Sequence, residues 1–137
     1  MADITITPGD ITAVSGALGV VAEAGEAIDA GQAVYIKSSD GKAYVASDAA
    51  EASARVAGIA LSSAEAAGQP VSYYAAGEIN VQAAAFASAG ILLVLSTAGA
   101  VQPVADKQTG EYVTVVGWST GTAKMMVDVT VTGQTSP

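Results

Sequence analysis

Short apolar runs and alternating apolar and polar positions fill most of the chain, and both patterns are typical of β-strands. The most regular alternation covers residues 125–132, where Val127, Val129 and Val131 share one face of a predicted strand. Residues 30–48 predict a β-hairpin, because two apolar runs flank Asp40-Gly41, a dipeptide that readily adopts the positive φ angles of a tight turn. The pattern therefore predicts an all-β protein.

Glycine and proline divide the other apolar runs into short segments. We expect strands at residues 4–7, 55–61, 71–75, 79–82, 91–95 and 112–118. One stretch departs from the β pattern, because Asp48 precedes Glu51 by three positions and alanines follow, as at the capped start of a helix. We therefore predict one short helix over residues 48–54.

Two parts of the chain resemble each other, at residues 27–77 and 86–133. Matching residues keep their order at separations of 58 or 59 positions; they are Gly31 and Gly90, Gly41 and Gly99, Asp48 and Asp106, and Gly58 and Gly117. A chain rich in alanine and valine could also produce such matches by chance. A duplication, which we favour, predicts a compact β-barrel or sandwich built from two similar β units.

The length of 137 residues fits one domain. We expect an N-terminal arm over residues 1–22, a single β domain over residues 23–133 and a tail over residues 134–137. Within the arm, residues 4–7 alternate as a half-buried strand does. This strand either pairs with an edge of its own domain or packs on a neighbouring subunit, since both satisfy its backbone groups.

Composition excludes several kinds of chemistry. The net charge is −8 and the five cations are scattered, which argues against a nucleic-acid partner; they are Lys37, Lys42, Arg55, Lys107 and Lys124. The chain has no cysteine and no histidine, so catalysis would depend on carboxylates, lysine or tyrosine, and we expect no catalytic residue, no metal and no cofactor. Glu23 and Glu26 lie close together, but we interpret them as part of a solvated turn.

Targeting signals are equally scarce. No apolar run approaches the roughly 20 residues that a membrane helix needs, so we expect no membrane partner. The N-terminus carries no basic region followed by an apolar segment, so we expect synthesis in a cytoplasm without secretion.

Interaction residues are the remaining candidates. For contact with a partner or a second subunit we select Ile4, Thr5, Ile6, Thr7 and Trp118. Trp118, the single tryptophan, is either part of the core, which we favour, or the centre of an interface. Tyr73 and Tyr74 could stack on a sugar, but adjacent strand residues point to opposite faces, so ordinary packing is the preferred interpretation.

Several segments resemble the small capsid cement, or head decoration, proteins of tailed bacteriophages. The likeness extends over residues 23–133 and is carried by residues 31–36, 40–46, 56–60, 68–71 and 110–117. The resemblance implies a non-enzymatic β protein on the outer surface of the phage head, commonly a homotrimer, that binds the major capsid protein and stabilises the shell. An anchoring role for residues 4–7 is our own inference, because the arm lies outside the likeness.

Two other functions stay open at this point. The same β scaffold could be a phage fibre or adhesin module that binds host-surface carbohydrate through Tyr73, Tyr74 or Trp118. An enzyme that uses carboxylates alone would need two of them in converging positions. Neither alternative is supported by a chemically distinctive motif.

Overall fold

The fold is described from a computed structural model, which places residue 4 and residues 11–13, 20–81 and 85–136. Within these residues the chain forms eleven strands, joined mostly by turns and loops. They are β1 (Thr12–Ala13), β2 (Val20–Glu23), β3 (Ala33–Ile36), β4 (Ala43–Val45), β5 (Gly58–Ala60), β6 (Pro70–Tyr74), β7 (Ala76–Asn80), β8 (Leu92–Leu95), β9 (Val101–Pro103), β10 (Tyr112–Ser119) and β11 (Lys124–Thr135). In the described part of the chain, no helix is long and apolar enough to cross a membrane.

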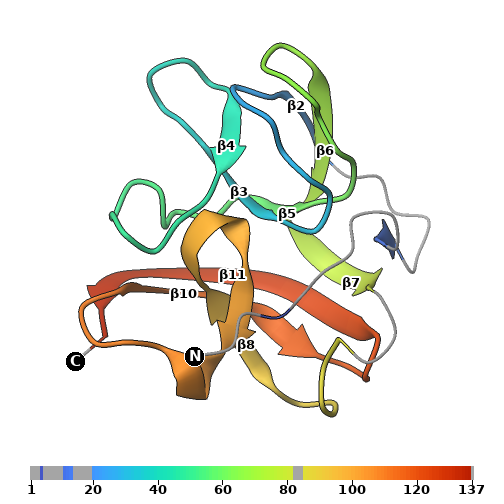
Figure 1. Ribbon diagram of the computed structural model, residues 1–137, viewed down its shortest axis with the longest axis vertical. Helices are drawn as coiled ribbons and strands as arrows, with labels where there is room; N and C mark the ends of the chain where they lie inside the picture. Colours follow the sequence, from blue (N-terminus) through green and yellow to red (C-terminus); the bar gives the residue numbers. More distant parts are fainter. Residues whose placement is uncertain (1–3, 5–10, 14–19, 82–84, 137) are drawn as a thin grey trace.

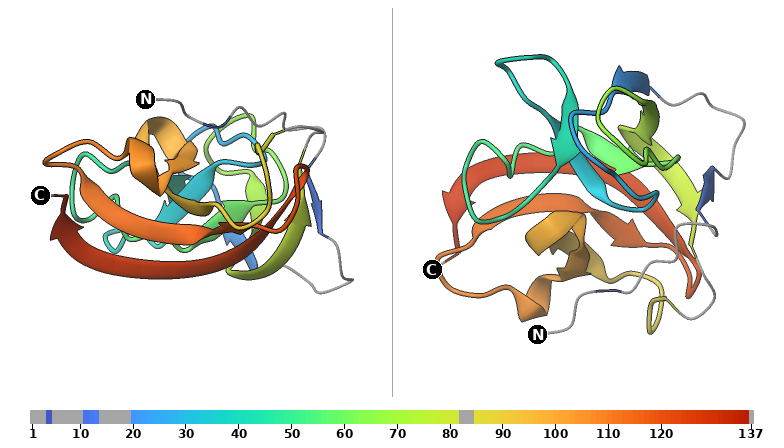
Figure 2. Two further views of the ribbon diagram at one scale, coloured as in Figure 1. Left: turned by 90° about the horizontal axis from the view of Figure 1, so that it is seen from below. Right: turned by 45° about the horizontal axis from the view of Figure 1, so that its top comes forward.

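The strands form two antiparallel sheets that lie one above the other (Figure 1). The smaller sheet has the order β2-β6-β5-β3-β4, and the larger has the order β1-β7-β11-β10-β8-β9. The larger sheet is dominated by the long, curved strands β10 and β11 (Figure 2). The predicted all-β class is confirmed, and of the two predicted architectures the molecule adopts the sandwich and not a closed barrel.

The two sheets repeat one topology. If β2–β6 are matched in order with β7–β11, both sets give the same sequence of neighbours across the sheet. The register agrees too, because Val34 pairs with Gly58 in the smaller sheet and Leu93 pairs with Gly117 in the larger. The prediction of two similar β units is therefore confirmed, and β1 is an additional strand at the edge of the larger sheet.

Gly58 and Gly117 are equivalent positions where the backbone of the next strand comes too close for a side chain. A Cβ at Gly58 would lie 2.4 Å from the carbonyl oxygen of Tyr74, and one at Gly117 would lie 1.8 Å from that of Met126. Tyr74 and Met126 belong to β6 and β11, which are themselves equivalent. Both units thus need glycine for the same packing reason.

Apolar side chains form two clusters, because the smaller sheet is covered on both faces. The larger cluster lies between the sheets and includes residues of both, such as Ile59, Leu93 and Met125. The second cluster lies on the other face of the smaller sheet, where Ile28 and Ala64 form a bridge between two loop segments. Adjacent residues of one strand therefore contribute to different clusters.

The helix predicted over residues 48–54 does not form, so this prediction is wrong. The segment makes a single turn, in which the Ala54 N–H lies 3.0 Å from the Ala50 carbonyl oxygen and 3.2 Å from that of Glu51. The carboxylate of Asp48 does not cap a helix; it contacts the Lys107 ammonium at 2.6 Å. An ion pair with the second unit has replaced the local capping interaction, and the described helical residues are limited to two 3-10 turns, Thr97–Gly99 and Val104–Asp106.

The N-terminal segments join both sheets. β1 pairs with β7 of the larger sheet, and β2 pairs with β6 of the smaller one. The backbone N–H of Ile4 donates to the Val101 carbonyl oxygen of β9 at 2.8 Å, and its side chain packs against the larger cluster. Residue 22, the end of the predicted arm, lies inside β2, and the division of the chain into arm, domain and tail stays a prediction.

Candidate functional site

Trp118 lies on the outer face of the larger sheet, away from the cluster between the sheets. Its cross-strand neighbours are Met126 of β11 and Leu92 of β8, and Met126 in turn lies opposite Glu78 of β7. The alternate residues of these strands, such as Met125 and Leu93, are buried between the sheets. Trp118 is 38% exposed and Leu92 is 39% exposed, so the preferred interpretation of Trp118 as a core residue is wrong.

The side chains of Leu92, Trp118 and Met126 form an apolar row across three adjacent strands, which we call the tryptophan row. Polar groups flank it. Glu78 extends the row on β7 and accepts a hydrogen bond from the Thr120 hydroxyl at 2.6 Å, and the exposed Lys124 and Asp128 lie two positions from Met126 on the same face. An apolar centre within a polar rim is the usual anatomy of a protein interface.

A second exposed apolar feature is the edge strand β2. Val20 is 50% exposed and Val21 is 67% exposed, although adjacent strand residues point to opposite faces. The strand pairs only with β6 in the described structure, so its other side is the edge of the smaller sheet. An apolar edge strand readily pairs with a strand of another chain.

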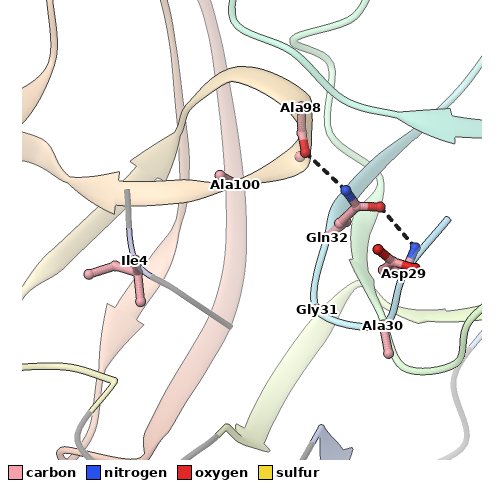
Figure 3. A pocket seen from close by; sticks show the side chains of 8 residues that line it. Ile4, Asp29, Ala30, Gly31, Gln32, Ala98 and Ala100 are labelled. Carbon is pink, nitrogen blue, oxygen red and sulfur yellow. Dashed lines mark hydrogen bonds between the residues drawn. The ribbon is translucent and has the colours of Figure 1, made fainter. Parts of the chain in front are cut away.

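A cavity of about 230 Å³ lies where the two units meet (Figure 3). It is lined by Ile4, residues 29–32 of the first unit and residues 98–100 of the second. The side chain of Gln32 spans the junction: its Nε2 donates to the Ala98 carbonyl oxygen at 3.1 Å, and its Oε1 accepts from the Asp29 N–H at 2.8 Å. Small side chains and one carboxylate line this cavity, which gives it little chemistry beyond joining the units.

Gly99 is packed against the first unit. Its N–H donates to the Ala46 carbonyl oxygen at 2.7 Å, and a Cβ there would lie 2.9 Å from side-chain atoms of both Gln32 and Val45. The corresponding Gly41 has no atom within 4 Å of an added Cβ. The turn of one hairpin therefore faces solvent, while the turn of the other contacts the neighbouring unit.

The carboxylates Glu23 and Glu26 stabilise the first hairpin. Glu23 forms a salt bridge of 3.0 Å with Lys42, and a carboxylate oxygen of Glu26 accepts the Val45 N–H at 2.8 Å. They act on separate partners and do not form the solvated turn that we expected. The arrangement is structural and offers no pair of carboxylates for acid and base catalysis.

Asp40 links the turn of the same hairpin to its second strand. Its carboxylate accepts a hydrogen bond from the Tyr44 hydroxyl at 2.7 Å and another from the Lys42 N–H at 3.0 Å. These bonds, the tyrosine's first, lower the pKa of Asp40, and the same contact raises the pKa of Tyr44. A hydrogen bond from Lys42 to Glu23 raises the pKa of Lys42.

The tyrosines proposed for sugar stacking are buried. Tyr73 belongs to the cluster on the outer side of the smaller sheet and Tyr74 to the cluster between the sheets. They therefore point to opposite faces, as the strand pattern predicted. A carbohydrate site built on this pair is wrong, and only Trp118 of the three proposed aromatic residues is exposed.

The structure brings the selected interaction residues only partly into view. Ile4 is half-buried against its own chain, Trp118 is exposed, and Thr5, Ile6 and Thr7 lie outside the described residues. Sequence reasoning missed Leu92 and Met126. Leu92 lies in a continuous apolar run that gives no alternation to separate its two faces, and only the pairing with Trp118 shows that it is exposed.

Comparison with known families supports the resemblance to cement proteins. A sequence model described as phage cement protein matches residues 1–71, which is more than half of the chain. The matched part includes β1–β5 and ends inside β6, so it covers nearly all of the first unit. A comparison with curated proteins gives no match. The chain belongs to the phage cement protein family, and its role is that of a structural, capsid-associated protein of the virion.

Proposed function

We propose that this protein binds the outer surface of an assembled phage capsid as a homo-oligomer, with a trimer as the expected form, and stabilises the shell. Its direct partner is the major capsid protein. The observation that supports this proposal best is the tryptophan row, an exposed apolar strip with a polar rim on a family member whose role requires binding.

The tryptophan row is the proposed contact with the shell. Tryptophan contributes disproportionately to binding at interface centres, because its large ring loses water contact over a wide area. The row is flat and crosses three strands of a rigid sheet, so binding does not require the sheet to rearrange. Repetition of this contact in a symmetric oligomer multiplies its strength through avidity.

The edge strand β2 is the proposed contact between subunits. Val20 and Val21 are exposed, and the edge offers unpaired backbone groups to a second chain. Strand addition there would bury both valines and extend the smaller sheet. Separate surfaces for the shell and for the oligomer allow the two contacts to be tested independently.

Co-sedimentation with heads that lack the protein tests the shell contact. The wild-type protein should bind these heads and raise the temperature at which they rupture. Trp118→Ala and Leu92→Thr should each reduce binding at least about tenfold, since truncation of a residue at an interface centre costs 2 kcal/mol or more. Ile36→Thr is the matched control, because Ile36 has similar exposure (37%) but lies on β3 of the smaller sheet.

Light scattering on the same variants tests the oligomer contact. Val21→Lys should convert the oligomer to monomers, because a charge on an edge strand opposes strand addition, whereas Trp118→Ala should leave the oligomer intact. A wild-type monomer, or wild-type protein that binds no head shell, would refute the proposal.

Carbohydrate binding is the alternative, and it now depends on the exposed Trp118 alone. A glycan array separates the two functions. Specific glycan binding that is lost in Trp118→Ala, together with unchanged binding to heads, would favour the adhesin function over the cement function.

A further inference from the structure

Lys107 and Asp48 form a buried contact between the two units. The Lys107 Nζ lies 2.6 Å from Oδ2 of Asp48, and the side chains are only 4% and 1% exposed. Asp48 follows β4 of the first unit, and Lys107 follows the 3-10 turn after β9 of the second. The pair thus joins the units at a point that water scarcely reaches.

Two further groups face the Lys107 ammonium. The Leu95 carbonyl oxygen accepts a hydrogen bond from it at 2.8 Å, and Oε1 of Glu111 lies 3.7 Å away. The Glu111 carboxylate is held by the Gln108 N–H at 3.0 Å and is partly exposed. An amine, a carboxyl group and a second carboxyl group therefore meet at one shielded site.

We propose that Lys107 and Asp48 condense to an intramolecular amide bond, with Glu111 carrying the proton. This is the only lysine in the described structure whose amine is buried against a carboxylate. A buried ion pair often costs as much in lost hydration as it gains in attraction, whereas an amide removes both charges. A covalent link between the units would also suit a protein that reinforces a shell, although the proposal does not depend on that role.

The reaction balances without an added reagent. One proton passes from the ammonium to the Asp48 carboxylate, which gives a neutral amine and a neutral acid. The nitrogen lone pair then attacks Cγ of Asp48, and the C–N bond forms as the carbonyl π bond opens. Glu111 accepts a second proton from the nitrogen and transfers it to the departing hydroxyl group. The C–O bond breaks, and one water molecule leaves.

Low exposure favours this chemistry in two ways. A dry site lowers the cost of converting the ion pair to the neutral pair, because neither charge is stabilised by water. The fold also holds the nitrogen in contact with the carboxyl group, which replaces an encounter in solution by a reaction within one molecule. The Leu95 carbonyl oxygen orients the amine by accepting one of its hydrogens.

Mass spectrometry of the purified, denatured protein tests the proposal. The wild-type chain should be lighter than its sequence by one water molecule. Trypsin should fail to cut after Lys107, and the peptide of residues 43–55, which contains Asp48, should remain joined to the peptide of residues 56–124. The joined peptide is the decisive readout, because removal of Met1 would change the intact mass but not this product.

Variants separate the roles of the three residues. Lys107→Arg and Asp48→Ala should show no joined peptide. Asp48→Asn should give the same joined product as the wild type, because the carboxamide loses ammonia where the acid loses water. Glu111→Gln should leave Lys107 and Asp48 unjoined, whereas Glu51→Gln, which alters an exposed carboxylate paired with Arg55, should not affect the link.

Two outcomes would overturn the inference. Wild-type protein with its full sequence mass and normal cleavage after Lys107 would show that the contact is an ion pair only. A joined peptide in Glu111→Gln, at the wild-type yield, would remove Glu111 from the mechanism. Neither outcome depends on capsid binding, so failure here is distinguishable from failure of the proposed cement function.

Discussion

Gln102 is a residue whose environment conflicts with its chemistry. It lies in β9 opposite Val94 and is fully buried, yet neither polar atom of its side-chain amide has a hydrogen-bond partner in the described structure. A buried amide without a partner loses its bonds to water and gains nothing in return. Its equivalent in the first unit is Tyr44, whose hydroxyl does have a partner, Asp40.

Replacement of Gln102 by an apolar residue of similar size should stabilise the protein. We expect Gln102→Leu or Gln102→Met to raise the free energy of unfolding by about 1–2 kcal/mol, because the desolvation cost of the amide disappears. Denaturant unfolding measures the change. A lower unfolding free energy in both variants would show that the amide has a partner under native conditions.

Gly117 illustrates the opposite case, a residue that fits too tightly to be changed. An added Cβ would overlap the Met126 carbonyl oxygen of the adjacent strand, and backbone cannot move aside as a side chain can. Gly117→Ala should therefore cost at least about 3 kcal/mol in unfolding free energy.

The control for Gly117 is Gly121, where an added Cβ has no atom within 4 Å. Gly121→Ala should change the unfolding free energy by no more than about 0.5 kcal/mol, as surface substitutions usually do. Equal unfolding midpoints for the two alanine variants would contradict the packing argument.

Among the elements, the first hairpin should respond to acid through Asp40. Because the folded state lowers the pKa of Asp40, the carboxylate contributes stability that is present above the unfolded-state pKa, about 4, and is lost as pH falls through the lower folded-state pKa. Tyr44→Phe removes the larger of the two hydrogen bonds responsible.

The difference in melting temperature between wild type and Tyr44→Phe should therefore be largest near neutral pH and shrink below about pH 4. Thermal unfolding across a pH series measures it. Tyr35→Phe is the control, because Tyr35 lies opposite Tyr44 in the hairpin and should show no such pH dependence. A difference that grows in acid would reverse the assigned sign.

Local signals predicted the elements well only where the partners were also local. The Asp40-Gly41 hairpin forms as expected, since its turn and both strands are adjacent in the sequence. The helix over residues 48–54 failed because Asp48 pairs with Lys107, a residue remote in sequence. No local pattern contains such a long-range contact.

The position of Trp118 depended on a similar long-range detail. Register shifts between Val115 and Gly117 interrupt the pairing of β10 with both of its neighbours. A shift of one residue transfers every following side chain to the opposite face of a sheet. Sequence periodicity could place Trp118 in a strand but could not decide between the core and the surface.

At the scale of the whole molecule, the matching glycines predicted a duplicated β sandwich, and the repeated strand order confirms two similar units. The sequence could not show how the units contact each other. That contact depends on differences between the copies, such as the buried turn at Gly99 and the side chain of Gln32 that spans the junction.

The junction between units should weaken when Gln32 is truncated. Gln32→Ala removes the hydrogen bonds to Ala98 and Asp29, and we expect a loss of about 1 kcal/mol in unfolding free energy. Gln134→Ala is the matched control, because Gln134 is an exposed glutamine in β11. A loss no larger than that of the control would show that the junction does not need this bridge.

The pairing of the N-terminal residues also orders the events of folding. β1 is synthesised first, but its partner β7 belongs to the second unit, and Ile4 waits for Val101 of β9. While the chain leaves the ribosome, the first unit can assemble around β2–β6, whereas these leading residues have no described partner until the second unit emerges. Contacts so distant in sequence form slowly. The earliest residues made should therefore be among the last to acquire protection from hydrogen exchange.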